Sequence, residues 1–426
     1  MGRSNTSNLP LTASLVGAIF FPQRPQLHLG ERQSSPDLQR KITETATRTK
    51  SFESAANLIE IWSDRPVASR TVAAIAEEVG QELSGKRDAE VDDFTHHRRH
   101  AEGVDPKHEL VAVFVDGGRV QVRDEAAGSG VHNERWQEDK IARLQTMTSQ
   151  CHSVDPCPEP LACFAKPILV GEGKSPSPPT ILPEISGELQ AFLDGKPTRE
   201  VVPAWQPKPL VRTCVGTMRP LEEFRWMVQA EAKQQHFDTA QRKAFVADGS
   251  HGNWTLWQRH FADFVPILDF VHAAEYLHAA SKALASVTLG CQWVRDLWQG
   301  KSLLVIASLR AALDVHGIGD ETLDEQHTLF AVQRAWTYLS NASDKLDYPR
   351  YRREGLPCTS SLIESQIKEF NARLKGSEKF WCESNAESML QLVCWSLRED
   401  GETLANYFAE RPTSQLRRGD PKTLAV

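Results

Sequence analysis

The sequence has no dense set of cysteines. It contains eight cysteines in 426 residues and no C-x-x-C pair, which excludes a disulfide framework and the usual spacing of a zinc finger. The tightest group of possible zinc ligands is Cys151, His152, Cys157 and Cys163, and its spacing is not that of a structural zinc site. This cysteine usage favours a reduced, cytoplasmic environment.

Long hydrophobic runs and an excess of positive charge are also missing. No apolar stretch has membrane-spanning length, so no membrane partner is expected. The run Leu11–Phe21 follows a single charge, Arg3, and precedes no small-residue cleavage site, which favours a buried or docking segment over a signal peptide. The formal net charge is −7 at pH 7. Because DNA-binding proteins are usually basic, any contact with nucleic acid would depend on local basic surfaces.

What is present is an ordinary globular composition, with 40% hydrophobic and 25% charged residues, in a chain long enough for two or three domains. Helical periodicity begins near Asp37, and the stripe of Ala55, Ile59 and Trp62 predicts one helix. A second helix is predicted from about Ser69. The pair is compatible with DNA-reading helices and equally with a plain helical hairpin. The highly charged residues 84–105 predict a linker.

The period then changes to that of strands. Residues 110–125 predict a strand, a turn at Asp116-Gly117 and a second strand, and residues 140–148 predict a third. Short buried strands are predicted at 243–247 and 264–268. Prolines are concentrated in residues 149–209, which predict an irregular insertion.

Helices account for the remaining periodic segments. They are predicted at 220–236, from near His272, at 362–374 and at 385–397, and residues 286–350 show only helical patterning. Core packing is favoured over base stacking for Trp254 and Trp257. Strands and helices that alternate around an all-helical block predict an α/β fold with a helical insertion.

Three carboxylates stand at the ends of predicted elements. Asp116 and Asp248 end apolar strands, and Glu364 lies in the first turn of a strong helix. Two-metal phosphoryl transfer needs carboxylates from different elements that converge on one place, and oxygen ligands suit Mg²⁺ or Mn²⁺. Asp269 is a fourth acid at a strand end.

Each of these acids also has a purely structural interpretation. Asp116-Gly117 is typical of a hairpin turn. Asp248-Gly249 can form a turn or cap the following helix. Ser361-x-x-Glu364 before an apolar helix is typical of a capping box. Spacing alone leaves the catalytic and the structural interpretations open.

The segments around these residues resemble a known family. The resemblance is to the DDE transposases of bacterial insertion sequences of the Kra-type group, relatives of the Mutator-like transposases. It rests on VFVDGGRVQVRD, WQEDK, KAFVADGSHGNW, FVPILDFVHAAEYLHAAS and, above all, the long block YPRYRREGLPCTSSLIESQIKEFNARLKGSEKFW. It covers about residues 20–400 and is poorest over 149–205.

The resemblance implies a fold and a set of site residues. The fold would be an RNase H-like mixed sheet with helices, interrupted by an all-helical insertion and preceded by an N-terminal helical domain. Asp116, Asp248 and Glu364 would be the catalytic ligands of two Mg²⁺ or Mn²⁺ ions, with Asp269 and His272 as supporting residues around them. The corresponding divisions are a tail at 1–35, a DNA-binding helical domain with linker at 36–104, the first part of the core at 105–285, the helical insertion at 286–355, the last core helices at 356–400 and a tail at 401–426.

The resemblance also implies a reaction and partners. Water would first attack the phosphodiester at a transposon end, and the freed 3′ hydroxyl would then attack target DNA. The partners would be transposon ends and target DNA, with a homo-oligomer as the class expectation and a cytoplasmic, nucleoid-associated location. The basic residues expected to contact DNA phosphates are Lys368, Arg373, Lys375, Arg352, Arg353 and Lys379, for which ion pairing within a helix is the structural alternative.

Two other functions remain open on the sequence. One is a transposase-derived protein that binds DNA without cutting it. The other is an RNase H-like nuclease that cleaves DNA without joining ends. Strand transfer with Mg²⁺ on DNA that bears the ends would distinguish all three.

Overall fold

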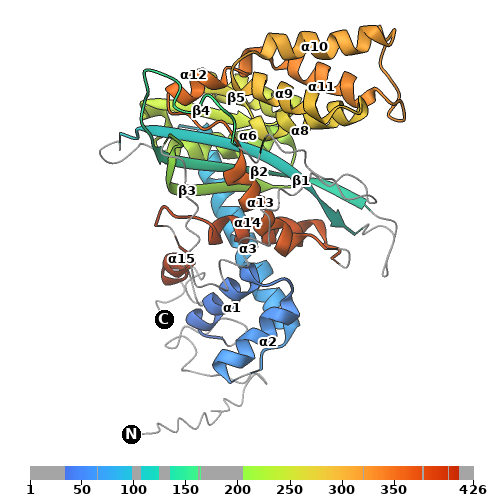
Figure 1. Ribbon diagram of the computed structural model, residues 1–426. Helices are drawn as coiled ribbons and strands as arrows, with labels where there is room; N and C mark the ends of the chain where they lie inside the picture. The colour runs from blue at the N-terminus through green and yellow to red at the C-terminus, as the bar shows by residue number, and fades with distance from the viewer. Residues whose placement is uncertain are drawn as a thin grey trace, which may run out of the picture. The chain divides into compact units, whose positions relative to one another are not determined.

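The computed structural model of the chain describes residues 34–64, 66–97, 107–123, 135–161, 164, 205–319, 321–376, 379–401 and 403–411. Its residues form two compact units (Figure 1). The sheet unit consists of residues 87–120 and 136–369, and the helical unit of residues 1–86, 121–135 and 370–426. Residues 1–33 and 412–426 of the predicted tails and most of the predicted insertion at 149–209 lie outside the described residues. Within the predicted C-terminal tail, residues 404–410 form a helix.

A five-stranded mixed sheet is the centre of the sheet unit (Figure 1). Its order is β3-β2-β1-β4-β5, and the strands are β1 (Leu110–Val122), β2 (Arg135–Thr148), β3 (Lys208–Thr217), β4 (Arg242–Ala247) and β5 (Val265–Leu268). The pairs β1/β4 and β4/β5 are parallel, and the pair β2/β3 is antiparallel. A mixed sheet in this order is compatible with an RNase H-like fold.

The first strand differs from the prediction, because β1 runs without a break through Asp116 and the two glycines that follow it. The predicted hairpin turn at Asp116-Gly117 is therefore wrong. A Cβ atom on Gly117 would stand 2.8 Å from the carbonyl oxygen of Asp139 in β2. Glycine here permits the close approach of two backbones and does not reverse the chain.

The other strands are mostly as predicted. The strands expected at 140–148, 243–247 and 264–268 are confirmed as β2, β4 and β5. The sequence did not predict β3, which begins at Lys208, inside the end of the supposed insertion. Its first residues are exposed and the buried ones come only from Thr213 on, so the apolar alternation that marks a strand is weak there.

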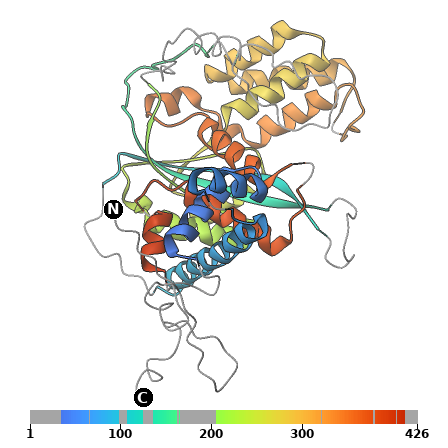
Figure 2. The ribbon, with the colours of Figure 1, turned by 90° about the horizontal axis from the view of Figure 1, so that it is seen from below.

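Helices cover the sheet and form a group beside it. They are α6 (Leu221–Gln234), α7 (His251–His260), α8 (Phe270–Ala283), α9 (Val287–Trp298), α10 (Ser302–Val315), α11 (Phe330–Asn341), α12 (Tyr348–Arg353) and α13 (Ser361–Leu374). Helices α8 to α11 pack on one another, and Figure 2 shows them together in yellow and orange. One core layer joins this group to the face of β1 that carries Ala112 and Phe114, and a second layer buries the opposite face under α6 and α7. The all-helical patterning of residues 286–350 is thus confirmed as helices.

The charged segment after residue 84 is not a linker at its start, because α3 (Ser69–Thr95) continues through it. In the sheet unit its last turns are held by packing: Val91 lies against the core, and the ring of Phe94 lies 6.5 Å from that of Trp226. The charged residues of these turns differ in exposure, because Arg87 is buried and pairs with Asp88 at 3.0 Å, whereas Asp92 is exposed. Residues 98–106 lie outside the described part of the chain.

The helical unit combines segments from both ends of the chain. Helix α1 (Pro36–Arg48) packs on α2 (Phe52–Ser63), α14 (Glu383–Ser396) and α15 (Leu404–Glu410). Arg411 pairs with Glu78 and Glu82 of α3, at 2.8 and 2.7 Å. The C-terminal helices therefore stabilise the N-terminal ones. Among the helices described here, none is both long enough and apolar enough to cross a membrane.

Candidate active site

Three acids lie at the same level of three adjacent parallel strands: Asp248 and Asp269 follow the ends of β4 and β5, and Asp116 lies within β1 beside them. Val115 of β1 pairs with Ala247 of β4, and Ala247 pairs with Leu268 of β5. The next residues are Asp116, Asp248 and Asp269. Because neighbouring strands lie about 4.8 Å apart, this register gathers the three carboxylates on one edge of the sheet.

Glu364 is brought to the same edge through Asp269 and Ser360. One carboxylate oxygen of Asp269 accepts the backbone N–H of Ser360 at 2.8 Å. The Ser360 carbonyl accepts the N–H of Glu364 at 3.1 Å, and the Ser360 hydroxyl donates to the Glu364 carboxylate at 3.2 Å. The first turn of α13 is therefore attached to the end of β5.

This arrangement also decides the capping alternative for Glu364. The residue before α13 is Ser360, whose carbonyl accepts the N–H of Glu364. Ser361 is therefore the first helical residue and Glu364 the fourth, whereas a capping box needs its glutamate at the third position. The predicted capping box of Ser361 and Glu364 is wrong. The Glu364 carboxylate is half-buried, and one of its oxygens lies within 4.8 Å of ligand atoms of Asp269 and His272.

Asp116 and Asp248 each use one oxygen in a local hydrogen bond. Asp116 accepts the N–H of Gly117 at 2.7 Å. Asp248 accepts the N–H of Ser250 at 3.1 Å and the side-chain amide of Asn253 at 2.7 Å. The turn expected after Asp248 is thus present. Among the described residues, the second oxygen of each carboxylate has no hydrogen-bond donor, which leaves it available to a ligand.

Negative charge is concentrated at this edge. Burial is the main cause that raises the pKa of Asp116 to about 6, and the charges of Asp248 and Glu364 raise it further, against the Gly117 N–H and His272. Burial and the neighbouring Asp269 raise the pKa of Glu364. Carboxylates that resist ionisation in this way are typical of sites that bind a cation.

His272 supplies the compensating positive charge. It stands in the first turn of α8, and its Nδ1 atom forms a short hydrogen bond with Asp269. Burial alone would lower the pKa of His272, but the bond to Asp269 and the charges of Asp269, Glu275 and Asp116 raise it to about 10. Burial also tends to raise the pKa of Asp269, but the hydrogen bond to His272 keeps this pKa below its ordinary value.

Glu275 is a further acid of the site that the sequence analysis did not identify. It follows His272 by one helical turn in α8, and its pKa rises to about 7 because of burial and of the charges of Glu364 and Asp269, although His272 opposes the shift. The spacing Asp269-x-x-His272-x-x-Glu275 is visible in the sequence. The sequence does not show that α13 lies close to this face of α8.

The site has the donors for a divalent cation. Asp269, His272 and Glu364 offer ligand atoms that all lie within 4.8 Å of one another. Asp269 is the least available of these, because Ser360, Val271 and His272 already donate hydrogen bonds to it. Within the part of the chain that the structure describes, Asp116, Asp248 and Glu364 each keep one carboxylate oxygen without a hydrogen bond, and such oxygens are the donors that Mg²⁺ and Mn²⁺ prefer.

The predicted DNA-contacting residues fall into two groups. Arg352 is fully buried, forms a bidentate pair with Asp155 at 2.8 and 2.5 Å and lies 4.0 Å above the ring of Trp298. Arg373 is 2% exposed and donates to the carbonyl of Ala46 at 2.6 Å. This burial argues against direct DNA contact by either arginine.

The remaining basic residues of that set are nearer to solvent. Lys379 is half-buried and donates to the carbonyls of Ala372 and Arg373 at the end of α13, each at 3.0 Å. Burial, together with Arg373 and Lys50, lowers its pKa to about 8. Lys368 is exposed, and Arg353 and Lys375 are half-buried.

Comparison with known proteins gives little support from sequence. No protein family matches the chain, and no curated protein does. Among solved structures, the chain is similar to the Drosophila P element transposase strand transfer complex, with 12% identity and a TM-score of 0.34 over 87% of this chain and 93% of that one. A TM-score of this size does not establish a common fold. Membership of the Kra-type insertion-sequence group therefore stays a prediction.

Proposed function

We propose that this chain is a DDE-type DNA transposase in which Asp116, Asp248 and Glu364 hold two divalent ions, Mg²⁺ or Mn²⁺. The proposal is supported chiefly by one observation: the two aspartates follow paired positions of parallel strands, and Glu364 is attached to the next strand end through Ser360. Carboxylates gathered from distant segments at one edge of a sheet are what two-metal phosphoryl transfer requires.

The chemistry divides between the ions and the side chains. The ions, when bound, stabilise the attacking and the leaving oxygen at phosphorus. Asp116 and Asp248 hold their free oxygens at fixed places because Gly117 and Asn253 bind the other oxygen of each. Asp269 orients both His272 and the start of α13. Glu275 adds a carboxylate that can accept a proton near neutral pH.

The DNA would lie along the acids, with phosphates contacted by exposed basic side chains. Lys368 is the strongest choice, because it stands one turn after Glu364 on α13 and is exposed. Arg353 and Lys375 are further choices. A homo-oligomer on paired ends and a nucleoid-associated location follow from the same proposal.

The test uses the purified protein and a DNA fragment that carries both sequences flanking its reading frame. The fragment is incubated with a supercoiled target plasmid and Mg²⁺ or Mn²⁺, and joined products are sequenced. Asp248→Asn is the inactive variant. Asp263→Asn is the matched control, because Asp263 pairs with Lys243 near the start of β4, at the end of the strand opposite to Asp248. We expect joined products from the natural protein and from Asp263→Asn only.

The other outcomes identify the alternatives. DNA bound but never cut, with either metal, would make the chain a transposase-derived binding protein. Cleavage without joined products would make it an RNase H-like nuclease.

A further inference from the structure

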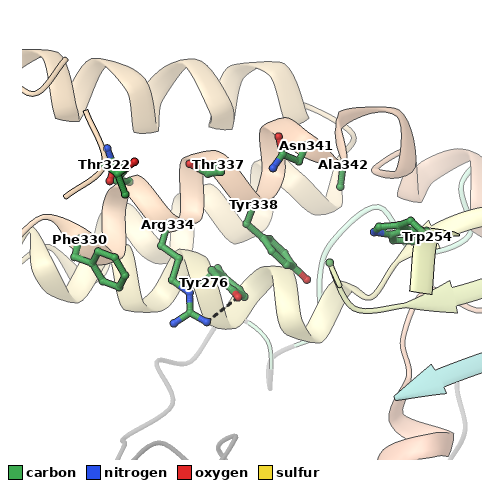
Figure 3. Close-up of a pocket in the computed structure, with 11 residues that line it drawn as sticks. Trp254, Tyr276, Thr322, Phe330, Arg334, Thr337, Tyr338, Asn341 and Ala342 are labelled. Carbon is green, nitrogen blue, oxygen red and sulfur yellow. Dashed lines mark hydrogen bonds between the residues drawn. The ribbon is translucent and has the colours of Figure 1, made fainter. Parts of the chain in front are cut away.

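A cavity of about 340 Å³ opens in the sheet unit (Figure 3). Its walls come from α7, α8 and α11, and its side chains include Trp254, Tyr276, Phe330, Arg334 and Tyr338. None of the described residues that line it is acidic. Its volume falls in the range of sites that enclose small organic groups.

The cavity is directly connected to the candidate active site along the chain. Gly249, in its wall, follows Asp248, and Tyr276 follows Glu275. A Cβ atom on Gly249 would stand 2.2 Å from the ring of Tyr338. Any larger residue after Asp248 would therefore displace the tyrosine that forms this wall.

Flat aromatic and cationic groups dominate one wall. The rings of Tyr276 and Tyr338 stack at 3.9 Å with an angle of 9° between their planes. Arg334 donates to the Tyr276 hydroxyl at 3.0 Å and lies 4.9 Å from the centre of that ring (Figure 3). Figure 3 also shows Tyr338 extending from α11 toward the side of the cavity where Trp254 lies. Asn341 and Thr337, both exposed on the same helix, add polar groups to this aromatic surface.

We propose that this cavity receives one nucleobase of the DNA strand whose phosphate lies at Asp116, Asp248 and Glu364. This assignment deepens the function proposed above and rests on it. A base is planar and uncharged, and it stacks on aromatic rings and guanidinium groups. It is also joined to a phosphate, which the divalent ions at Asp116, Asp248 and Glu364 would hold. The absence of acidic side chains from the described lining fits a ligand that is attached to an anionic backbone.

The experiment measures base stacking without any reaction. A single-stranded 12-nucleotide DNA with 2-aminopurine at its centre is titrated with the full-length protein in Ca²⁺, which binds carboxylate oxygens and replaces Mg²⁺ without supporting the reaction. Stacking quenches the fluorescence of 2-aminopurine. An unlabelled oligonucleotide of the same sequence, with adenine at the centre, competes for binding. A second competitor is identical except for an abasic site at the centre. We expect quenching, and we expect the abasic competitor to be roughly 5- to 150-fold weaker, the range for one stacked base.

Two variants test the contribution of the aromatic wall of the cavity to binding. Arg334→Ala removes an exposed side chain and Tyr276→Leu removes the stacking ring, and each should reduce the affinity for the base-bearing strand by a similar factor. Arg295→Ala is the matched control, because Arg295 is half exposed and pairs with Glu159 away from the cavity. Equal quenching by Arg334→Ala, Arg295→Ala and the natural protein would overturn the proposal. So would equal competition by the two competitors, or quenching of free 2-aminopurine deoxyribonucleotide without quenching of the oligonucleotide.

The two proposals fail in different ways. Quenching without strand transfer in the assay above would refute the reaction and leave a base-binding pocket. Strand transfer without quenching would support the reaction and refute the pocket.

Discussion

Val115 of β1 pairs with Ala247 of β4 in parallel register, so Asp116, within β1, and Asp248, just after β4, lie side by side. Two carboxylates at about the spacing of neighbouring strands repel one another unless a cation lies between them. Burial is the main cause of the raised pKa of Asp116, and the charges of Asp248 and Glu364 raise it further.

Amide replacement of the three acids should weaken metal binding and preserve the fold. Because partners of a metal ligand are themselves worth roughly 10- to 100-fold in affinity, we expect Asp116→Asn, Asp248→Asn and Glu364→Gln each to reduce Mn²⁺ affinity at least about tenfold. Isothermal titration calorimetry measures this, with Asp263→Asn as the control. Unchanged affinity in all three variants would show that the acids do not hold the metal.

The stability of the metal-free protein should fall as the pH rises from about 4 to 7. The pKa of Asp116 is about 6 in the folded chain, against an ordinary value of 3.8, so the folded state holds this proton more tightly. Its contribution to stability is fully present below the unfolded value and is lost as the pH passes through about 6, at a cost of roughly 1–3 kcal/mol. Glu275, with a pKa of about 7, acts in the same direction.

Urea denaturation at several pH values in EDTA checks this expectation. Asp116→Asn should remove much of the pH dependence and should be more stable than the natural protein at pH 7.5. Mn²⁺ should raise the melting temperature of the natural protein more at pH 7.5 than at pH 5. A metal-free protein whose stability increases over this interval would contradict the pKa assignments.

Loss of Asp269 should destabilise the sheet unit. Asp269 is fully buried, pairs with His272 and binds two chain segments. Asp269→Ala leaves the imidazolium and the Ser360 N–H without their partner, and removal of one member of a buried pair costs about 3–5 kcal/mol. Denaturant unfolding measures this loss.

Ser360→Ala is the informative comparison for Asp269. It keeps the backbone N–H that Asp269 binds and removes only the hydroxyl that donates to Glu364. It should cost about 1 kcal/mol in stability while it lowers activity, since Glu364 loses its fixed direction. A variant as active as the natural protein would show that this bond does not position Glu364.

Lys368 and Arg352 should respond differently to replacement by alanine. Lys368→Ala should leave stability within about 0.5 kcal/mol and reduce the salt dependence of DNA binding by about one phosphate contact. Arg352→Ala should instead destabilise by about 3–5 kcal/mol, because it leaves the carboxylate of Asp155 unpaired. Fluorescence anisotropy at several salt concentrations, with parallel unfolding curves, separates the two effects.

The buried strands could be predicted because their signal is local. Residues 243–247 and 264–268 are short apolar runs that end at an acid, and both form strands. The continuity of β1 could not be predicted, since Asp-Gly-Gly is typical of a turn and only the nearby Asp139 carbonyl explains Gly117. The contact between Gly117 and the distant Asp139 outweighed the local preference for a turn.

The same limit applies to the site. Asp116, Asp248 and Glu364 were identified as ends of elements, but the roles of the basic residues depend on distant partners. Arg352 binds Asp155, 197 residues away, and Arg373 binds Ala46, 327 residues away. Sequence spacing cannot separate such buried arginines from exposed ones. Glu275 was missed for the related reason that α13 meets α8 only in the folded chain.

The chain leaves the sheet at Asp269 and returns to the same point. The N–H of Phe270 binds the carbonyl of Cys358 at 3.1 Å, and Tyr348 donates to the carbonyl of Leu268 at 2.9 Å. The segment between Asp269 and Ser360 is therefore a long insertion whose two ends are held together by hydrogen bonds. Closing a longer loop costs only slightly more entropy. The segment can therefore gain or lose whole helices while Glu364, which follows it, stays at the same position beside the sheet.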